Sequence, residues 1–292
     1  MEAHNLCCIG FITRDKVVTP QNTIFMPGGT AYYFAHAMKH LNTAGFQLIT
    51  ALSASDMHVV EEMRKESIEV KALPSLYSVC FENIYGENQN ERTQRVTAKA
   101  DPFTVEGLRD ISANIIHLGS LLADDFSTEV IEHLSKKGLL SVDVQGFLRK
   151  VEDEKVFPVD WPEKLAALKH IHILKANESE MEVLTGCPEP HDAALMIAGW
   201  GVKEVLLTLG DKGSLIYADG QFYEIPAYPA SRIVDATGCG DTYMVGYLYM
   251  RDQGATFREA GCFAAAMCTM KLQSHGPFNG TEEEVRKIMA TA

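Results

Sequence analysis

The sequence lacks the surplus of positive charge that a general nucleic-acid or anionic-membrane surface requires. It carries 26 Lys and Arg against 39 Asp and Glu, a formal net charge of −13 at pH 7. Binding along a phosphate backbone needs a basic face, so we expect neither nucleic acid nor a membrane as a partner. A single small anion stays compatible with this charge, because one helix N-terminus can hold a phosphate locally.

Long apolar runs are also missing, and so are the cysteine spacings typical of metal sites and disulfide frameworks. No run reaches the 18 or more apolar residues of a membrane span, and residues 1–10 lack the basic start and cleavage site of a signal peptide. The seven cysteines are odd in number and include no CxxC pair. Their spacing fits neither a zinc ribbon nor a disulfide framework, so we expect reduced thiols in a cytoplasmic protein.

Motifs of several enzyme classes are absent. The chain has no GxxxxGK[ST] phosphate loop, no HRD or DFG motif, and no GxSxG motif. Residues 238–243 lack the third glycine of a dinucleotide-binding fingerprint and stand near the C-terminus. An oxidoreductase is therefore the least favoured class.

The hydrophobic pattern predicts the fold class. Short apolar runs alternate with amphipathic stretches, which indicates a mainly parallel α/β sheet covered by helices on both faces. The expected strands are 5–12, 47–52, 114–118, 139–142, 170–174 and 204–207, and the expected helices are 30–41, 57–66, 128–137, 163–168, 178–184 and 193–198. From residue 203 onward we expect a meander of 205–209, 214–217 and 221–225, followed by three helices.

Two regions interrupt the alternation of strands and helices. Residues 78–85 and 93–98 have the pattern of strands, and 17–25 is a further extended stretch. We interpret them as a small β-sheet lid with strands from about 14–26 and 76–99. Exposed strand edges of such a lid favour pairing with a second copy, which predicts a homodimer.

The most informative motif is Asp235-Ala236-Thr237-Gly238-Cys239-Gly240-Asp241-Thr242, directly before an expected helix. Small residues at 238–240 let backbone N–H groups converge at the positive end of that helix, which makes an anion cradle. An acid after such a cradle repels phosphate unless it has a task, such as taking a proton from an attacking hydroxyl. The same residues also suit an ordinary capped turn, and spacing alone leaves both interpretations open.

Three other segments place glycine or polar residues at the ends of expected elements. Gly28 and Gly29 precede the helix 30–41. Asn177 and Glu180 share the first turn of another helix, where their oxygens suit Mg²⁺ held through water, although a capping box is locally the better interpretation. Residues 208–213 follow a strand and suit either a nucleotide site or a hairpin turn.

Taken together and in order, these motifs resemble the ribokinase-like (PfkB-type) carbohydrate kinases over nearly the whole chain. The order is Asp15, Gly28-Gly29, Asn177-x-x-Glu180, Thr208-Leu209-Gly210-x-x-Gly213 and Asp235-x-Thr237-Gly238-x-Gly240-Asp241. The resemblance implies a doubly wound α/β fold in a single domain of residues 1–292. It also implies transfer of the γ-phosphoryl group of ATP, with Mg²⁺, to a hydroxyl of a small sugar or polyol beneath a β-sheet lid.

The resemblance also implies a role for each motif. Asp241 would be the base that takes the hydroxyl proton, kept ionised by the helix N-terminus. The remaining roles are an anion hole from the backbone of Gly238, Cys239 and Gly240; Mg²⁺ held through water by Asn177 and Glu180; a nucleotide site at Thr208, Gly210, Gly213 and Asn177; a monovalent cation, K⁺, at Asp235 and Thr237; and acceptor hydroxyls at Asp15, Gly28 and Gly29.

One position departs from the family pattern and bears on the acceptor. Tyr33 stands where many sugar-binding members carry Asn, and a Tyr offers one hydroxyl and an apolar face. Ribose and fructose 6-phosphate are therefore disfavoured, and the chain looks similar to members that phosphorylate inositol-like polyols. Gln145, which follows a strand, and Arg92 or Arg95, on the lid, are further candidates for contact with the acceptor. The two arginines also suit solvated positions at a strand edge.

Two alternatives remain open from the sequence. In a nucleoside kinase, Tyr33 or Phe34 would stack on the base. In a non-catalytic nucleotide-binding regulatory protein, ATP would bind without turnover; an acid at Asp241 beside its glycine cradle argues against that.

Overall fold

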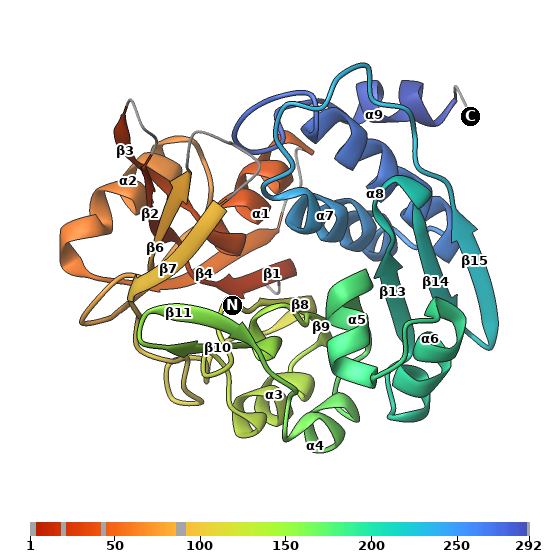
Figure 1. Cartoon of the computed structure of the whole chain (residues 1–292), viewed down its shortest axis with the longest axis horizontal. Coiled ribbons are helices and arrows are strands. Elements are labelled where there is room, and N and C mark those ends of the chain that lie inside the picture. Colours follow the sequence, from red (N-terminus) through yellow and green to blue (C-terminus); the bar gives the residue numbers. More distant parts are fainter. Residues whose placement is uncertain (1–3, 19–21, 42–44, 86–91, 291–292) are drawn as a thin grey trace.

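A nine-stranded sheet forms the centre of the computed structural model, which describes residues 4–18, 22–41, 45–85 and 92–290 (Figure 1). All neighbouring strands are parallel except at one edge, where two strands turn back as a meander. The strand order is β15 (Gln221–Ile225), β14 (Ser214–Ala218), β13 (Glu204–Thr208), β12 (Ile173–Asn177), β9 (Leu139–Asp143), β8 (Ala113–Gly119), β1 (His4–Gly10), β4 (Phe46–Leu52) and β5 (Val70–Pro74).

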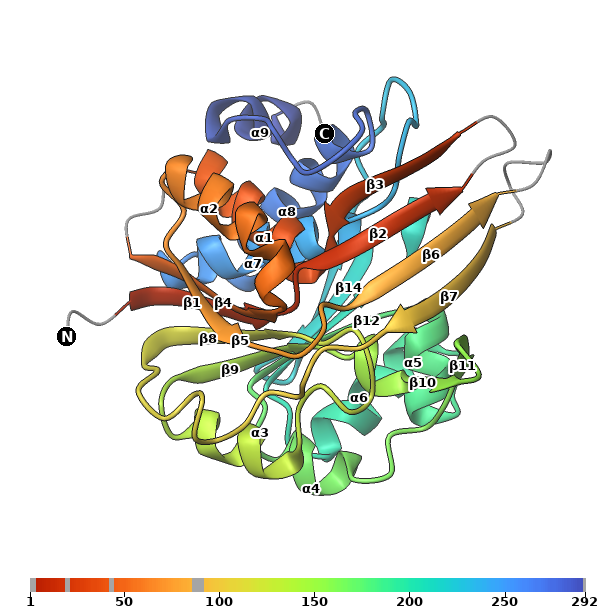
Figure 2. The ribbon, with the colours of Figure 1, turned by 90° about the vertical axis from the view of Figure 1, so that its left-hand side faces the viewer.

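Helices cover both faces of this sheet (Figure 2). One face carries α1 (Gly29–His40), α2 (Met57–Lys65), α7 (Cys239–Asp252), α8 (Phe257–Lys271) and α9 (Glu282–Met289), and the other carries α3 (Thr128–Ser135), α4 (Lys164–Leu168), α5 (Glu178–Thr185) and α6 (Pro190–Gly199). Three short 3₁₀ turns are η1 (Ala54–Asp56), η2 (Gly146–Leu148) and η3 (Gly210–Lys212). The predicted doubly wound α/β class is confirmed.

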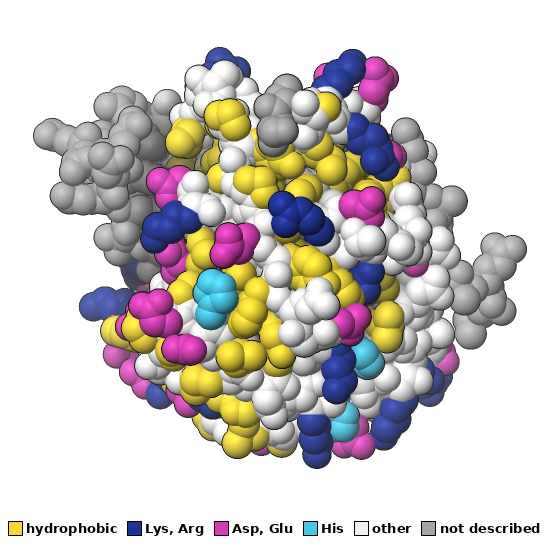
Figure 3. Space-filling view, turned by 90° about the vertical axis from the view of Figure 1, so that its right-hand side faces the viewer, with side chains coloured by type: hydrophobic (Ala, Val, Ile, Leu, Met, Phe, Trp, Pro, Cys, Tyr) yellow, Lys and Arg dark blue, Asp and Glu magenta, His cyan; other side chains and the backbone are white. Residues whose placement is uncertain are grey.

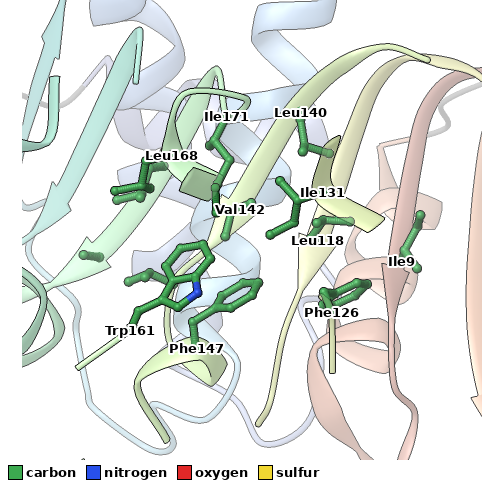
Figure 4. Close-up of a cluster of buried hydrophobic side chains, with 14 of the residues drawn as sticks. Ile9, Leu118, Phe126, Ile131, Leu140, Val142, Phe147, Trp161, Leu168 and Ile171 are labelled. Carbon is green, nitrogen blue, oxygen red and sulfur yellow. The ribbon is translucent and has the colours of Figure 1, made fainter. Parts of the chain in front are cut away.

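The two faces of the sheet hold separate hydrophobic clusters. Figure 4 shows the cluster beneath α3 and α4, where the rings of Phe147 and Trp161 stack with their centroids 4.1 Å apart. Leu118 and Val142 reach this cluster from the strands, and Ile131 reaches it from α3. Apolar side chains on both faces explain why the central strands are continuous apolar runs rather than alternating ones.

The strand order reverses between β1 and β8, which are neighbours although β4 and β5 lie between them in the chain. In open α/β sheets a crevice for ligands forms at such a reversal, outside the carboxyl ends of the strands. Glycine is needed at position 119, at the end of β8, because α1 approaches the backbone closely there. A Cβ on Gly119 would lie 2.1 Å from the methyl carbon of Thr30, at the start of α1. The first turn of α1 therefore packs directly on the end of β8.

A second, six-stranded sheet lies beside the crevice, with β2 (Thr13–Val18), β3 (Thr23–Gly28), β6 (Cys80–Tyr85) and β7 (Arg92–Ala98) in the regions from which we expected lid strands (Figure 2). The stretch 17–25 is not one strand, because β2 and β3 pair as an antiparallel hairpin. The sheet also includes a hairpin absent from our prediction, β10 (Arg149–Glu152) and β11 (Lys155–Pro158).

One face of the molecule, nearest β15, mixes apolar side chains with acidic and basic ones (Figure 3). None of the helices built from the described residues is long and apolar enough to cross a membrane.

Candidate active site

A cavity of about 880 Å³ lies between the carboxyl ends of the main strands and the second sheet. Eleven of the residues singled out from the sequence line its wall: Asp15, Gly29, Tyr33, Gln145, Asn177, Thr208, Asp235, Thr237, Gly238, Gly240 and Asp241. Gly28, Cys239, Glu180, Gly210 and Gly213 are not on this wall. The side chain of Arg92 lies outside the described part of the structure, although its backbone begins β7.

The glycine cradle forms at the N-terminus of α7. Gly238 is the N-cap, with φ +76°, and a Cβ there would lie 2.2 Å from the ring of Tyr33, so the position requires glycine. The backbone N–H and hydroxyl of Thr242 both donate to the Gly238 carbonyl, at 2.9 and 2.8 Å. These hydrogen bonds close the first turn of α7, and the approach of Gly238 to the ring of Tyr33 packs that turn against α1.

One of the three expected donors of the cradle, the N–H of Cys239, is already hydrogen-bonded. The N–H of Cys239 donates to the carbonyl of Ala236 at 3.1 Å, within the turn itself. Because the first intrahelical bond runs from Thr242, helix geometry leaves the N–H groups of Gly240 and Asp241 without intrahelical partners. The N–H groups of Gly240 and Asp241 therefore have the arrangement that binds an anion at a helix N-terminus.

Asp241 lines the cavity at the start of α7, and the hydroxyl of Thr30 donates a hydrogen bond to its carboxylate. Burial and the nearby Asp143 raise the pKa of Asp241 to about 6, against the opposing effects of Lys175 and Thr30. We expected the helix N-terminus to have the largest effect on this pKa and to keep Asp241 ionised. Burial outweighs it because the carboxylate is removed from water. The group still ionises near neutral pH and is a stronger base than an exposed aspartate.

A buried ion cluster lies directly behind the cradle. The ammonium of Lys175, on β12, is 2.9 Å from Oδ2 of Asp143 and 3.7 Å from Oε2 of Glu180. A Cβ on Gly240 would lie 3.0 Å from the same ammonium, so Lys175 lies against the anion site. Burial alone would lower the pKa of Lys175, but Asp143 and Glu180 outweigh it and raise the pKa. Lys175 is thus a fixed positive charge beside the cradle.

The half of the cavity under the second sheet presents carboxylate and amide side chains among the apolar ones of Val17, Ile24, Met26 and Phe81. Asp15 accepts a hydrogen bond from the hydroxyl of Thr13 at 2.7 Å, and a Cβ on Gly28 would lie 2.5 Å from Oδ2 of Asp15. Gly28 therefore acts by making room for Asp15. Across β6 and β7, the amide of Gln94 donates to Oδ1 of Asn83 at 3.0 Å.

Gln145 extends this polar half of the wall from the loop after β9. Its backbone N–H donates to Asp143 at 3.1 Å, and its side-chain amide donates to Glu180 at 3.3 Å. The next basic residue along the chain, Arg149, also lines the cavity.

Two aromatic residues, Tyr33 and Phe34, were candidates for stacking on the base of a nucleoside, and they lie in different surroundings. Phe34 is fully buried, and its ring stacks on His117 with the centroids 5.0 Å apart, so it belongs to the core. Tyr33 lines the cavity, but its side chain is only 5% exposed and packs against Gly238. The hypothesis that Phe34 stacks on a nucleoside base is wrong because the ring is inside the sheet–helix interface.

Asn177 lines the half of the cavity at β12 and β13, and Glu180 is hydrogen-bonded to it without reaching the wall. Asn177 accepts from the backbone N–H of Glu180 at 2.9 Å, and Glu180 accepts from that of Asn177 at 2.8 Å, so the capping box is formed. A carboxylate has lone pairs to spare, and Glu180 lies beside Asp143, so these residues fit a Mg²⁺ ion held through water. Among the described residues, no three or more His, Cys, Asp and Glu side chains gather closely enough to bind a metal directly.

The predicted nucleotide loop is only partly on the cavity wall. Thr208 lines it, at the end of β13. Gly213 has φ +91°, and a Cβ there would lie 2.1 Å from the carbonyl oxygen of Ile225, so packing against β15 already requires glycine. Gly210 has φ +61° and open space around it.

Asp235 is held from two sides. Its Oδ1 accepts from the backbone N–H of Thr237 at 2.9 Å, and its carbonyl oxygen accepts from the ammonium of Lys271 at 2.9 Å. Burial would raise the pKa of Asp235, but the hydrogen bonds from Thr237 and the charge of Lys271 lower it overall. The expected cation-binding segment is therefore anchored to the end of α8.

Several wall residues were not identified from the sequence: Thr30, Asn83, Gln94, Arg149 and Lys175. A lysine inside an otherwise apolar run was the available signal for Lys175. The others are single polar residues whose significance appears only when α1, β6, β7 and β10 converge.

Comparison with known proteins identifies relatives over the whole chain. A kinase of the ribokinase family solved with a pyrophosphate analogue and myo-inositol superposes with a TM-score of 0.85 at 28% identity, covering 97% of this chain and 99% of that one. A pyrophosphate-dependent myo-inositol-1 kinase, converted into a 3-kinase by changing an asparagine and a serine eleven positions apart to leucine, superposes with the same TM-score at 27% identity, covering 98% and 99%.

A curated relative is the cytidine kinase of Thermococcus kodakarensis, 40% identical over 94 residues. This match includes 32% of the present chain and spans only 34% of that kinase. The model of the pfkB family carbohydrate kinases matches residues 11–284. The chain therefore belongs to the pfkB family of carbohydrate kinases, within the ribokinase-like proteins.

Proposed function

We propose that this chain transfers a phosphoryl group to a hydroxyl of a cyclic polyol of the inositol class, with inorganic pyrophosphate as the donor. The observation that carries the proposal is a carboxylate with a raised pKa, Asp241, in the same cavity as Asp15, Asn83, Gln94 and Gln145. Carboxylate and amide groups each bind neighbouring hydroxyls, so this wall suits a molecule with hydroxyls around its ring.

The choice of acceptor also depends on the second sheet. Asn83 and Gln94 are eleven positions apart, hydrogen-bonded across β6 and β7. The two substitutions that change the product of the related inositol kinase have the same separation. This correspondence supports an inositol-like acceptor whose orientation depends on Asn83 and Gln94.

The donor proposal departs from the ATP that the resemblance implied. The related kinases at 27–28% identity use pyrophosphate, and Lys175 and Arg149 line the cavity near Asp241, where a compact polyanion needs positive charge. ATP is the second candidate, since Thr208 reaches the cavity wall at the loop expected to bind a nucleotide.

The proposed reaction is an in-line displacement at phosphorus. The acceptor oxygen forms a bond to the terminal phosphorus of pyrophosphate while the bridging P–O bond breaks, and inorganic phosphate leaves with the bonding pair. Asp241 takes the hydroxyl proton, and the N–H groups of Gly240 and Asp241 with the ammonium of Lys175 stabilise the charge on the transferred group. Mg²⁺, held through water by Asn177 and Glu180, would neutralise donor charge.

We also propose that the second sheet closes over the acceptor as a lid, and that its edge pairs with a second copy. β3 is the outer strand of this sheet, and Ile24 and Phe25 on it are 53% and 55% exposed. An exposed apolar edge strand favours pairing with another chain. Light scattering at micromolar concentration should give the mass of a dimer, and a monomer would remove this part of the proposal.

The test combines two donors with a panel of acceptors. Purified protein with Mg²⁺ and either pyrophosphate or ATP is incubated with inositol isomers, ribose, fructose and cytidine, and ³¹P NMR detects the phosphomonoester. Asp241→Asn should reduce turnover by about 10²–10⁴-fold, the usual range for a general base. Asp124→Asn is the control, because Asp124 is 61% exposed in a surface ion pair.

Each outcome has a distinct meaning. Turnover of an inositol with pyrophosphate that is lost only in Asp241→Asn supports the whole proposal. Turnover with ATP alone would overturn the proposal that pyrophosphate is the donor. Preference for cytidine would overturn the proposed polyol acceptor in favour of a nucleoside kinase. Donor binding without turnover of any acceptor favours the regulatory alternative, and full activity in Asp241→Asn removes Asp241 as the base.

A further inference from the structure

A lysine ends α8 in a position where its charge has no contact with water. Lys271 is 0% exposed, and its ammonium donates to the carbonyl oxygen of Asp235 at 2.9 Å and to that of Ser274 at 3.3 Å. Oδ2 of Asp235 completes the set at 3.5 Å. Three oxygens therefore surround an ammonium group that has three protons.

This environment is the kind that binds a monovalent cation. Burying an ammonium is costly unless its charge is paired and its protons are hydrogen-bonded. Here one carboxylate pairs the charge, two backbone carbonyls accept the other protons, and the C-terminal end of α8 adds negative potential. Backbone carbonyls and a carboxylate are also the ligands that an alkali cation takes in proteins.

A separate K⁺ ion at Asp235 and Thr237 does not fit these residues. Oδ1 of Asp235 accepts the N–H of Thr237, and the carbonyl oxygen and Oδ2 of Asp235 face Lys271. The oxygens that such an ion needs are already shared with an ammonium. We infer that Lys271 replaces the monovalent cation as a built-in positive charge, and that catalysis by this chain is independent of K⁺.

The same lysine positions the approach to the cradle. The N–H of Val234 donates to the carbonyl of Leu272 at 2.7 Å, so the segment before Gly238 is tied to the end of α8 beside the ammonium. Displacing that segment would shift the N-terminus of α7, and misplacement by about 1 Å costs about 10²-fold in rate. Lys271 is thus a positioning residue, which acts through Asp235 and the turn that follows.

The first test needs no variant. Wild-type turnover, measured with the donor and acceptor found active above, is compared in chloride salts of K⁺, Na⁺, NH₄⁺ and tetramethylammonium at equal ionic strength. We expect the rates to agree within about twofold, since the positive charge is covalently attached. Activation of about tenfold or more by K⁺ over tetramethylammonium would overturn the inference.

The second test removes the ammonium. In Lys271→Ala the Asp235 and Ser274 oxygens lose their cation, and the Ser274 hydroxyl, buried without a partner in the described part of the chain, adds another oxygen. We expect kcat to fall by about 10²-fold and K⁺ or NH₄⁺, but not tetramethylammonium, to restore part of it. The control is Lys287→Ala, because Lys287 is 69% exposed on α9.

Thermal unfolding separates this inference from the proposed function, on which only the rate measurements depend. A cation that binds the folded state raises Tm, so K⁺ should raise the Tm of Lys271→Ala above its value in tetramethylammonium and leave wild type unchanged. A K⁺-dependent rise of the wild-type Tm would overturn the inference even if no acceptor were found. A variant that loses both rate and Tm with no response to any cation would show a merely structural lysine.

Discussion

Replacing Lys175 with methionine tests whether the ion cluster behind the cradle acts as a unit. Met keeps most of the side-chain volume but removes the ammonium that lies 2.9 Å from Asp143 and 3.7 Å from Glu180. Both acids are more than nine-tenths buried, so their charges would be left without a cation. Breaking a buried ion pair in this way costs about 3–5 kcal/mol of unfolding free energy.

The pH dependence of this loss distinguishes electrostatics from packing. Protonation of a carboxyl group removes an unpaired charge, so the destabilisation of Lys175→Met should be largest at pH 8 and smaller at pH 5. In the variant the pKa of Asp241 should rise above its wild-type value of about 6, because the charge of Lys175 opposes the effect of burial in the wild type. Urea unfolding at both pH values, with a pH–rate profile, measures these changes.

Lys212→Met is the matched control. Lys212 pairs with Glu178 at 3.1 Å on the surface and is 72% exposed, so its loss should cost about 0–1 kcal/mol at either pH. A cost below about 1 kcal/mol for Lys175→Met at pH 8, or an equal cost at pH 5 and pH 8, would refute the electrostatic reasoning.

Three further predictions concern the wall of the cavity. Because the pKa of Asp241 is about 6 and its ionised form is the base, kcat/KM should rise with pH up to about 6 and then level off; a flat profile from pH 5 to 8 would contradict this. Gly238→Ala should lower both stability and rate, at about 1–2 kcal/mol for the left-handed backbone alone, whereas Gly199→Ala, with open space around it, should be neutral or stabilising in the same urea titration. Asn83→Leu combined with Gln94→Leu should change which hydroxyl is phosphorylated, as determined by NMR of the product; an unchanged product and KM would exclude these amides from acceptor contact.

The local motifs were predictable because their signals lie in consecutive residues. Small residues at 238–240 beside Asp241 indicate a tight helix entry whatever the rest of the chain does. The capping box of Asn177 and Glu180 is likewise a short-range pattern, and it is present. Contacts such as the one between Thr30 and Asp241 join residues from opposite ends of the chain, and no local pattern encodes them.

Two errors in the predicted strands arose because tertiary contacts outweigh the local sequence pattern. The strand predicted at 170–174 is in fact Ile173–Asn177, because Lys175 looked like the end of an apolar run. Asp143 supplies the charge that lets this lysine lie inside a buried strand. The hairpin of β10 and β11 was missed because its strands are short and polar, and its turn places Asp153 and Glu154 at positive φ without glycine.

The two buried lysines explain together how an acidic chain can hold a phosphoryl group. Lys175 lies behind the cradle and Lys271 lies beneath the segment that leads into it, so the stretch from Asp235 to Asp241 has a fixed positive charge on each side. Each charge is costly to bury, which is why each has a carboxylate partner. Once buried, the charges need no reorganisation during the reaction, and preorganised charge of this kind is usually the largest contribution to catalysis. A net charge of −13 over the whole chain is therefore compatible with anion binding, because backbone N–H donors and the ammonium of Lys175 act locally at the N-terminus of α7.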